Sequence, residues 1–583
     1  MWVYGRFVFS LSFVMDDYII STSGMSGPLA ATLRASFDGS LTWSGYRPLT
    51  EAIRVLMMHA FGLQLMWPYF IICLGLHLLN TLLAYRLVGR VSGNVAWSFF
   101  AAAVVLLLPS HNESIFWFSA IANSLGLLFS LLALDFALTS LSRNAMIWQV
   151  AAVAAYGLAE LSCEAAILLP ILIFTAEWFL IGRPRGHRLR FYFFMAAAAV
   201  ALLGLRLYAQ GSVVVRARED YGFALGPLHL MRGYLLIAYQ MIAMTTSPYP
   251  GAPTFEYARN WLAFDEFEAW FAIGLTALLS AATFYLALHN QPDDSTPNVT
   301  RPGRRHLFWI AWGLLWIVTL GVPFAGLSGR NPENRYTYLL VFGMAVALTA
   351  LVSWLYTATR SRVRRGLVIT FAVALLALYS YTSTSDAHDW AAAGRIVQST
   401  QRTILAAVPS LDDDQTIAQL DIPARVGSAY TFATDATFQA AIQLLYKTDR
   451  PTIARTENLR KYLRDNPAAA GKTFVFKYDE ATGDVEPTVA VILCNTPDDC
   501  SFFKVARPDG VGLNSGTRYL ELYDVNNPEL GGVSLYARLD PFQFLACSFR
   551  QDWGVPLAED ALTVYPYEER CKDAIAAFLA NKR

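Results

Sequence analysis

Apolar residues fall into blocks of about twenty along the first part of the chain, and no such block follows residue 385. A helix of about twenty residues, rising ~1.5 Å per residue, spans a hydrocarbon core of roughly 30 Å. The pattern therefore predicts a membrane region over residues 1–385 and a soluble region over residues 386–583.

A sliding-window interpretation predicts about eleven membrane-spanning helices in the first region. The first, residues 2–15, is short and contains Arg6, and a true start upstream of Met1 stays open. A signal peptide is the alternative for this segment, but no small-residue cleavage site precedes Asp16, which favours a spanning helix. The other segments are residues 67–87, 95–109, 121–141, 146–161, 164–182, 191–209, 269–288, 307–326, 337–357 and 367–384.

Basic residues in short loops predict the orientation, because such loops stay on the cytoplasmic side. The clusters fall on one side if the apolar segment 230–247 is an interfacial or re-entrant helix instead of a twelfth crossing. The N-terminus is then cytoplasmic, and Asp16, Asp17 and residues 386–583 are periplasmic or extracellular, on a chain expected in the inner (plasma) membrane. The clusters are Arg86 and Arg90, Arg143, Arg183–Arg190, Arg301–Arg305 and Arg360–Arg365.

Composition agrees with this interpretation. Hydrophobic residues make up 55% of the chain, charged residues 15%, and the mean hydropathy is +0.37, which indicates an integral membrane protein. The formal net charge is zero, but the first lysine is Lys447. Any cation that the membrane region uses in chemistry is therefore arginine, histidine or a metal, and no nucleic-acid partner is expected.

The soluble region predicts an α/β or α+β domain. Residues 416–423, 473–478 and 488–494 have strand patterns, and residues 435–446 and 566–581 have helical ones. The region holds an even number of cysteines, as expected in an oxidising compartment. The simplest pairing joins the first two and the last two, although four reduced core cysteines remain an alternative; the residues are Cys494, Cys500, Cys547 and Cys571.

Polar groups gather in five loops on the predicted external face. Carboxylates in a half-buried cleft suit removal of a proton from a hydroxyl, and two adjacent acids can instead hold a divalent cation. Arginine forks suit phosphate oxygens. Together with a bilayer for a lipid tail, these groups describe sugar transfer from a lipid-linked donor; they are Asp16 and Asp17, Arg47, His111 and Glu113, Glu160 and Glu164, and Arg330–Tyr336.

Six short motifs follow one another in a distinctive order: Phe13-Val-Met-Asp-Asp17, Tyr46-Arg-Pro-Leu49, His77-Leu-Leu-Asn80, Pro109-Ser-His-Asn-Glu113, Ser162-Cys-Glu164 and Arg335-Tyr-Thr-Tyr-Leu339. This order resembles the GT-C membrane glycosyltransferases. It is most similar to bacterial relatives of the O-mannosyltransferases that carry tetratricopeptide repeats. The resemblance covers about the first 385 residues, and the repeats themselves are missing from the rest of the chain.

The resemblance implies a GT-C fold, a polyprenyl-phosphate sugar donor, an external acceptor and inversion at the anomeric carbon. It implies that Asp16 is the base and that Asp17 is its partner or a metal ligand. A divalent cation, Mg or Mn, would be held by Asp16, Asp17 and Glu113. His111 and Glu113 match the second-loop motif, Arg335 and Tyr336 match the motif near the donor phosphate, and Arg47 and Glu164 support the site.

Two departures from the family pattern concern charge. Relatives usually have Ser-Lys-Glu where this chain has Ser162-Cys163-Glu164, so a phosphate-binding lysine is absent and Arg330 or Arg335 would have to compensate. After Trp117, the usual Gly-Arg and Asp positions are Ala120, Ile121 and Asn123.

The expected function is therefore transfer of a sugar from a polyprenyl-phosphate donor to a protein, a lipid or a cell-surface glycan. A transporter or flippase for lipid-linked sugars is one alternative, and a polymerase or ligase of surface polysaccharide is another. Transporters typically show internal repeats and broken helices at mid-bilayer, which the sequence does not. The loop carboxylates favour transfer.

Overall fold

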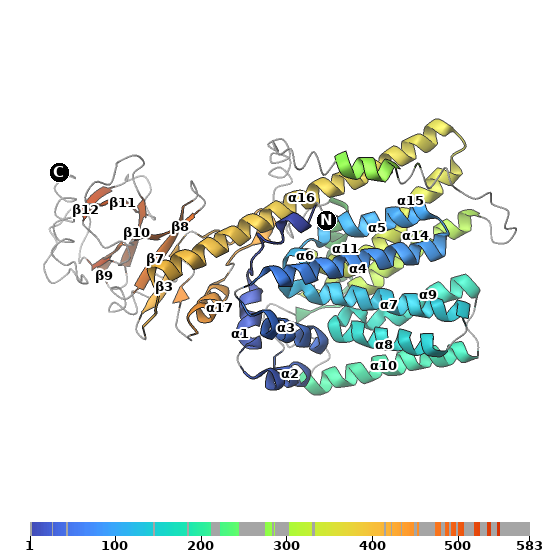
Figure 1. Ribbon diagram of the computed structural model, residues 1–583, viewed down its shortest axis with the longest axis horizontal. Helices are drawn as coiled ribbons and strands as arrows, with labels where there is room; N and C mark the ends of the chain where they lie inside the picture. Colours follow the sequence, from blue (N-terminus) through green and yellow to red (C-terminus); the bar gives the residue numbers. More distant parts are fainter. Residues whose placement is uncertain are drawn as a thin grey trace. The chain divides into compact units, whose positions relative to one another are not determined.

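The structure is a computed structural model, and its fold is drawn in Figure 1. It describes residues 3–25, 27–41, 45–63, 65–143, 146–182, 186–210, 222–243, 274–282, 285, 302–328, 333–412, 415–420, 422–432 and 434–447. Beyond these it describes strands at residues 452–453, 473–479, 484–488, 491–496, 499–506, 518–524, 533–537 and 545–548.

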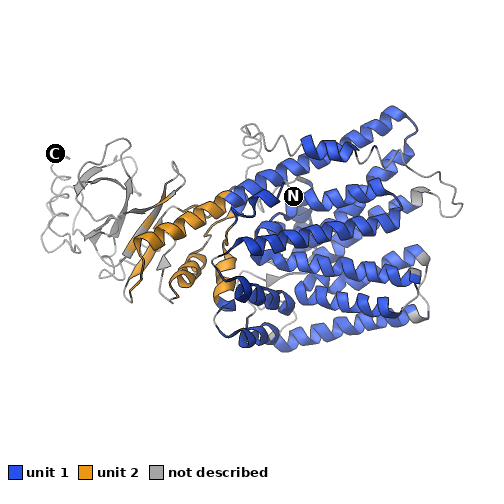
Figure 2. Ribbon diagram, viewed as in Figure 1, with its two compact units in different colours: residues 1–11, 23–391, 427–429 blue, residues 12–22, 392–426, 430–583 orange. Residues whose placement is uncertain are grey.

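The chain divides into two compact units, coloured in Figure 2. Unit 1 comprises residues 1–11, 23–391 and 427–429, and unit 2 comprises residues 12–22, 392–426 and 430–583. The expected boundary after residue 385 falls inside one continuous helix, α16 (Arg362–Ala407).

Unit 1 is helical. Its short elements are α2 (Leu29–Asp38), α3 (Pro48–Phe61), α6 (Glu113–Phe116) and the 3-10 helices η1 (Gly5–Phe7), η2 (Pro109–His111), η3 (Phe118–Ala120), η4 (Glu164–Leu168) and η5 (Asn334–Leu340). Its longer helices are α4 (Trp67–Ser92), α5 (Val95–Leu107), α7 (Ile121–Arg143), α8 (Met146–Ser162), α9 (Leu169–Ile181), α10 (His187–Gln210), α11 (Pro227–Ala243), α14 (Pro302–Ala325) and α15 (Val341–Ala358). A two-stranded pair joins β1 (Gly222–Phe223) to β2 (Leu327–Ser328).

Six helical segments of the described chain are long and apolar enough to cross a membrane: residues 67–92, 118–141, 188–209, 305–325, 334–358 and 362–407. Shorter apolar helices cover residues 95–107 and 146–162. The chain is thus an integral membrane protein with an apolar helix at most of the expected segments. Of the expected segment 269–288, only residues 274–282 and 285 are described.

Residues 2–15 do not form the spanning helix that the sequence predicts. The described part of this stretch contains only the short η1, and a regular helix, α1 (Asp16–Gly24), begins after it. The Tyr4 hydroxyl donates to the carbonyl oxygen of Leu106 at 2.8 Å, and the Tyr4 side chain is buried. Tyr4, one of the residues that predicted a membrane helix, therefore packs against the end of α5.

Two local features set how the helices turn and pack. Gly93 ends α4 with a φ of 68°, and the Asn94 side chain caps α5 by accepting from the backbone N–H groups of Ala96 and Trp97 at 2.9 and 3.2 Å. A Cβ atom on Gly313 would lie 2.5 Å from the carbonyl oxygen of Gly343. Glycine is required there because the backbones of α14 and α15 approach closely, as small residues permit in membrane bundles.

Unit 2 contains two mixed sheets and the helix expected at residues 435–446, which is α17 (Asp435–Tyr446). One sheet has the order β6-β3-β7-β8, with β3 (Thr416–Leu420) parallel to β6 (Thr452–Ile453) and β7 (Thr473–Asp479), and β8 (Asp484–Thr488) antiparallel to β7. A short pair joins β4 (Arg425–Val426) and β5 (Ala429–Tyr430). The expected helix at 566–581 lies outside the described residues.

The second sheet has the order β12-β11-β10-β9-β13. Its strands are β9 (Val491–Thr496), β10 (Asp499–Ala506), β11 (Arg518–Asp524), β12 (Val533–Ala537) and β13 (Leu545–Ser548). Cys494 on β9 is the direct cross-strand partner of Cys500 on β10, next to a register irregularity at Asp499. Cys547 lies on β13, and Cys571 lies outside the described residues.

This backbone pairing sharpens the disulfide prediction. Opposed residues of an antiparallel pair have Cα atoms about 4.5–5.5 Å apart, within the range of about 4.4–6.8 Å that a disulfide needs. We expect a Cys494–Cys500 crosslink when the protein is isolated without reductant, measured by peptide mapping of alkylated protein with and without prior reduction. Recovery of both cysteines as alkylated thiols before reduction would contradict the prediction.

Candidate functional site

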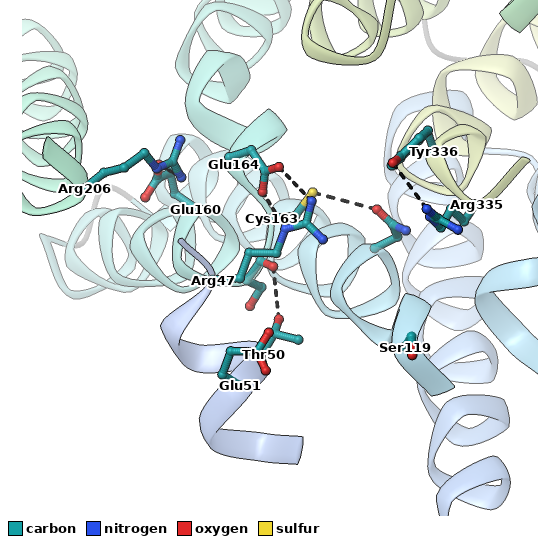
Figure 3. Close-up of polar contacts among 12 residues, drawn as sticks. Arg47, Thr50, Glu51, Ser119, Glu160, Cys163, Glu164, Arg206, Arg335 and Tyr336 are labelled. Atoms are coloured by element: carbon teal, nitrogen blue, oxygen red, sulfur yellow. Dashed lines mark hydrogen bonds and ion pairs between the residues drawn. The ribbon is translucent and has the colours of Figure 1, made fainter. Parts of the chain in front are cut away.

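The Arg47 and Glu164 side chains form a bidentate ion pair (Figure 3). Nε of Arg47 donates to Oε2 of Glu164 at 2.6 Å, and Nη2 donates to Oε1 at 2.7 Å. Arg47 directly precedes α3, whose first residue is Pro48, and Glu164 opens η4. The pair thus joins two segments that are more than a hundred residues apart in the sequence. Its two parallel hydrogen bonds fix the orientation of the Arg47 guanidinium.

The pair is charged although it is largely shielded from water. Burial by itself would raise the pKa of Glu164, but the charge and the hydrogen bonds of Arg47 lower it to about 2. Burial by itself would lower the pKa of Arg47, and Glu164 more than offsets this, so the pKa is raised. The spanning helix expected at 164–182 starts only at Leu169, where α9 begins, so Glu164 lies in the connection before it.

A second ion pair and a thiol surround this fork. Arg206 on α10 donates to Glu160 on α8 at 2.8 Å. The Cys163 sulfur lies 3.8 Å from Oδ1 of Asn123. Figure 3 shows Cys163 beside the Arg47 guanidinium, in the direction of Arg335. The position where a lysine is expected from the family is therefore a buried neutral side chain in contact with an amide.

The Arg335 guanidinium is framed by aromatic rings. Its Cζ atom lies 4.5 Å from the ring centre of Trp117 and 5.1 Å from that of Tyr336, and it forms an ion pair with Glu333. Tyr336 in turn stacks on Phe324 at 4.7 Å. Arginine over aromatic faces keeps its charge while its plane is held in place.

The second-loop segment is bonded to η5 by three hydrogen bonds. Oε2 of Glu113 accepts from the Arg335 backbone N–H at 3.0 Å, and the Ser114 hydroxyl donates to the Arg335 carbonyl at 3.1 Å. The Thr337 hydroxyl donates to the Ser110 carbonyl at 2.7 Å. The structure therefore brings the predicted second-loop residues together with Arg335 and Tyr336, and it gives Glu113 a positioning contact.

His111 is buried without a hydrogen-bond partner for either ring nitrogen among the described residues. Its ring lies 5.3 Å from that of His77 and 5.1 Å from that of Tyr338. Burial, and then His77, lower the pKa of His111, so it is neutral near pH 7. Buried side-chain polar atoms usually have partners, so both nitrogens are available to a ligand.

The sequence interpretation missed two residues of α16 that adjoin this loop. Nδ2 of Asn112 donates to Asp386 at 2.7 Å, and both side chains are buried. Trp390 lies 6.3 Å from Phe116 and 6.5 Å from Trp117, ring centre to ring centre. The available signal was the polar run at residues 385–389 directly after the last apolar block.

Asp16 and Asp17 belong to unit 2 and open α1. Asp17 is fully buried and accepts from the Val14 backbone N–H at 3.1 Å, whereas Asp16 is partly exposed. Between Val14 and the two carboxylates, Met15 has a φ of 45°, a left-handed conformation that costs energy for a residue with a side chain. The two carboxylates thus differ in environment. The hydrogen bond from the Val14 N–H to the Asp17 carboxylate closes the strained turn.

Two further expectations are untested at this site. Arg330 lies outside the described residues. Within the part of the chain that the structure describes, no group of three or more His, Cys, Asp or Glu side chains is placed to hold a metal ion. A divalent cation therefore stays a prediction.

Comparison with solved structures finds nine similar chains. Two of them are ArnT from Cupriavidus metallidurans in the apo state, at 14% identity, and the same protein bound to undecaprenyl phosphate, at 13% identity. Each match covers 82% of this chain and 91% of that chain, with a TM-score of 0.35. No family model and no curated protein matches the chain. Because a likeness this distant assigns no activity, the function is argued from the residues themselves.

The Arg47–Glu164 pair predicts a pH-dependent contribution to stability. Glu164→Gln removes the charge that Arg47 pairs with, so we expect the free energy of unfolding to fall by about 1.5–3 kcal/mol at pH 7. Because the folded-state pKa of about 2 lies below the ordinary 4.5, the pair stabilises the protein above about pH 4.5. The difference between parent and variant should shrink as the pH falls from 4.5 towards 2.

Unfolding of detergent-solubilised protein, followed across this pH range, measures the effect. Asp38→Asn is the matched control, because Asp38 is an exposed carboxylate whose hydrogen bonds are to Ser40. We expect the control to change stability by less than about 0.5 kcal/mol. A Glu164→Gln effect that is the same at pH 3 and pH 7 would show that the pair does not act through charge.

Proposed function

We propose that the protein is a membrane glycosyltransferase that moves a sugar from a polyprenyl-phosphate donor to an acceptor hydroxyl, with inversion at the anomeric carbon. The acceptor is a protein, a lipid or a cell-surface glycan on the external side of the inner (plasma) membrane. The motif order and the charged groups collected in unit 1 support the proposal.

One observation carries the proposal: the Arg47 guanidinium is held in place and has N–H donors that Glu164 does not use. Glu164 takes the N–H groups of Nε and Nη2, and Nη1 makes no hydrogen bond within the described residues. A guanidinium has five donors in one plane, and its remaining edge matches two oxygens of a phosphate. Glu164 holds the fork in place, so little side-chain entropy is lost when an anion binds.

Arg335 supplies the second guanidinium of this proposal. Trp117 and Tyr336 hold it from the sides, and Glu333 neutralises part of its charge. Figure 3 shows Arg47 beside Cys163, with Arg335 and Tyr336 to one side of them. We assign the donor phosphate to these two arginines, which replace the lysine absent at position 163.

The donor sugar is assigned to the groups around His111. Its two ring nitrogens need partners, and sugar hydroxyls offer both donors and acceptors. Phe116 and Trp117 follow His111 closely along the chain, and Trp390 of α16 lies near both rings, so this region offers apolar ring faces for a sugar. These residues bind the donor and take no part in proton transfer.

The chemical step needs a base, and we assign that role to Asp16. The acceptor oxygen attacks the anomeric carbon, its proton passes to the Asp16 carboxylate, and the bond from the anomeric carbon to the phosphate oxygen breaks. The leaving polyprenyl phosphate takes the bonding electrons, and Arg47 and Arg335 stabilise its charge. Asp17 positions this segment through its bond to the Val14 backbone.

The assignment of the two aspartates predicts unequal effects of the same substitution. Asp16→Asn removes the base, so kcat should fall by about 10²–10⁴-fold. Asp17→Asn keeps a side-chain oxygen that can accept from the Val14 N–H, so its loss should be less than about tenfold, within the range expected from one neutral hydrogen bond.

The measurement is release of polyprenyl phosphate and formation of glycosylated product by purified protein offered a panel of polyprenyl-phosphate sugars. Asp38→Asn serves as the exposed control. Addition of EDTA followed by Mg²⁺ or Mn²⁺ tests the predicted cation in the same assay. If Asp16→Asn transfers sugar like the parent, the base is assigned wrongly. If the parent moves the intact donor across vesicles without consuming it, the transferase proposal fails.

A further inference from the structure

A cavity of about 420 Å³ lies inside unit 1 between helices that the proposed chemistry does not use. Residues of α4, α5, α7, α9, α14 and α15 line it, together with the α4–α5 turn. Its volume falls within the range of about 300–1,000 Å³ that is typical of small-molecule sites. The cavity is therefore large enough to hold part of a ligand.

The cavity begins at the ends of these helices that lie away from η2 and η5, and it extends along α15. It is lined by Asn94 and Trp97 at the start of α5, whereas the end of α5 leads into η2 and His111. On α15 it is lined from Phe342, near the start of the helix, to Thr357, near its end. Figure 1 allows the course of both helices to be followed. None of the residues assigned to the donor phosphate or sugar is among the described residues that line the cavity.

The lining extends along the helix axis. On α15 it runs from Phe342 to Thr357, fifteen residue steps that correspond to about 22 Å at ~1.5 Å per step. The lining on α15 is therefore longer than the depth of one leaflet, which is about 15 Å in a roughly 30 Å hydrocarbon core. A site of this length and direction suits an extended hydrocarbon chain better than a compact solute.

The walls combine apolar and polar side chains. Leu87, Val88, Leu134, Phe342 and Val346 are among the apolar lining residues. Polar lining residues lie at the α4–α5 turn and along α15; they are Ser92, Asn94, Thr349, Ser353 and Thr357. Such a mixed lining suits an amphipathic molecule.

Two lining residues carry buried polar atoms that lack partners. Nε1 of Trp309 and Oγ1 of Thr349 have no hydrogen-bond partner among the described residues. Buried polar side-chain atoms are bonded in the large majority of cases. These two atoms are a separate observation that indicates a ligand carrying hydrogen-bonding oxygens, such as the ester groups below a lipid headgroup.

Arg305 supplies positive charge at the polar end, and His306 beside it supplies ring nitrogens for hydrogen bonds. Arg305 and His306 line the cavity at the start of α14, and no Asp or Glu is among its described lining residues. Arg305 is exposed and contacts the carbonyl oxygen of Val91 at the end of α4. An anion is therefore the favoured partner for this end.

We propose that the cavity binds one chain of an anionic phospholipid, whose phosphate is held by Arg305 and His306. Basic pockets between transmembrane helices are suited to acidic headgroups on the cytoplasmic side, where the Arg301–Arg305 cluster is expected. The proposal does not depend on the sugar-transfer reaction, because none of the described lining residues is assigned to that reaction.

Native mass spectrometry of the full chain, released from nanodiscs of equal phosphatidylglycerol and phosphatidylcholine, tests the proposal. We expect retained phosphatidylglycerol to exceed phosphatidylcholine. Arg305→Gln should reduce phosphatidylglycerol retention by about fivefold, the factor for one basic residue at a membrane surface. Arg362→Gln is the matched control, since Arg362 is an exposed arginine near the start of α16 that does not line the cavity.

Ala350→Phe tests the chain-binding part separately, because a phenyl ring at this lining position fills the cavity. It should lower retention of phosphatidylglycerol while the thermal unfolding of the protein stays close to that of the parent. Equal retention of the two lipids by the parent overturns the proposal, as does an unchanged Arg305→Gln or an unchanged Ala350→Phe. A further sample receives 10 mM inorganic phosphate. Displacement of the lipid by phosphate alone would also overturn the proposal, because the acyl chain would then contribute nothing to binding.

Discussion

Backbone groups that leave the helical pattern inside a membrane protein must find hydrogen-bond partners within the protein. At one end of α5 and one end of α15, the chain does leave that pattern, as η2 with α6 and as η5. The two segments satisfy each other: Glu113 accepts from the backbone of Arg335, and Thr337 donates to the backbone of Ser110. This mutual bonding fixes Arg335 and His111 in one region, and the assignment of a donor site in unit 1 depends on it.

Two positions at which the family resembled in sequence usually carries charge are neighbours in the structure. Position 163 is cysteine where lysine is expected, position 123 is asparagine where aspartate is expected, and the two side chains are in contact at 3.8 Å. Cys163 is also packed tightly, since a Cβ on Gly126 would lie 2.7 Å from its Cβ atom. Two neutral side chains thus contact each other where the resemblance would place a cation and an anion, and the proposed mechanism assigns the phosphate to Arg47 and Arg335 instead.

Apolar blocks predicted most helices because a helix that crosses a membrane needs a long run of such residues whatever its neighbours are. The same criterion failed at residues 2–15, where apolar side chains such as Tyr4 bury against α5 instead of facing lipid. Arg47, Glu164, His111 and Arg335 were found because charge is conspicuous in an apolar chain. The contact of Asn112 with Asp386 was not predictable, because it joins residues 274 positions apart through packing that no local pattern encodes. Nor does a sequence distinguish Asp16 from Asp17, whose environments differ only once α1 is formed.

The central claim is that Arg47 binds the phosphate of a polyprenyl donor through the edge that Glu164 leaves available. Affinity for a short-chain polyprenyl phosphate, measured by isothermal titration on parent and Arg47→Lys protein, tests it most directly. Lysine keeps a positive charge near Glu164 but loses the planar fork, so we predict binding about tenfold weaker at a temperature where both proteins stay folded, while exposed Arg34→Gln binds like the parent. Equal affinity of Arg47→Lys and parent would contradict the claim.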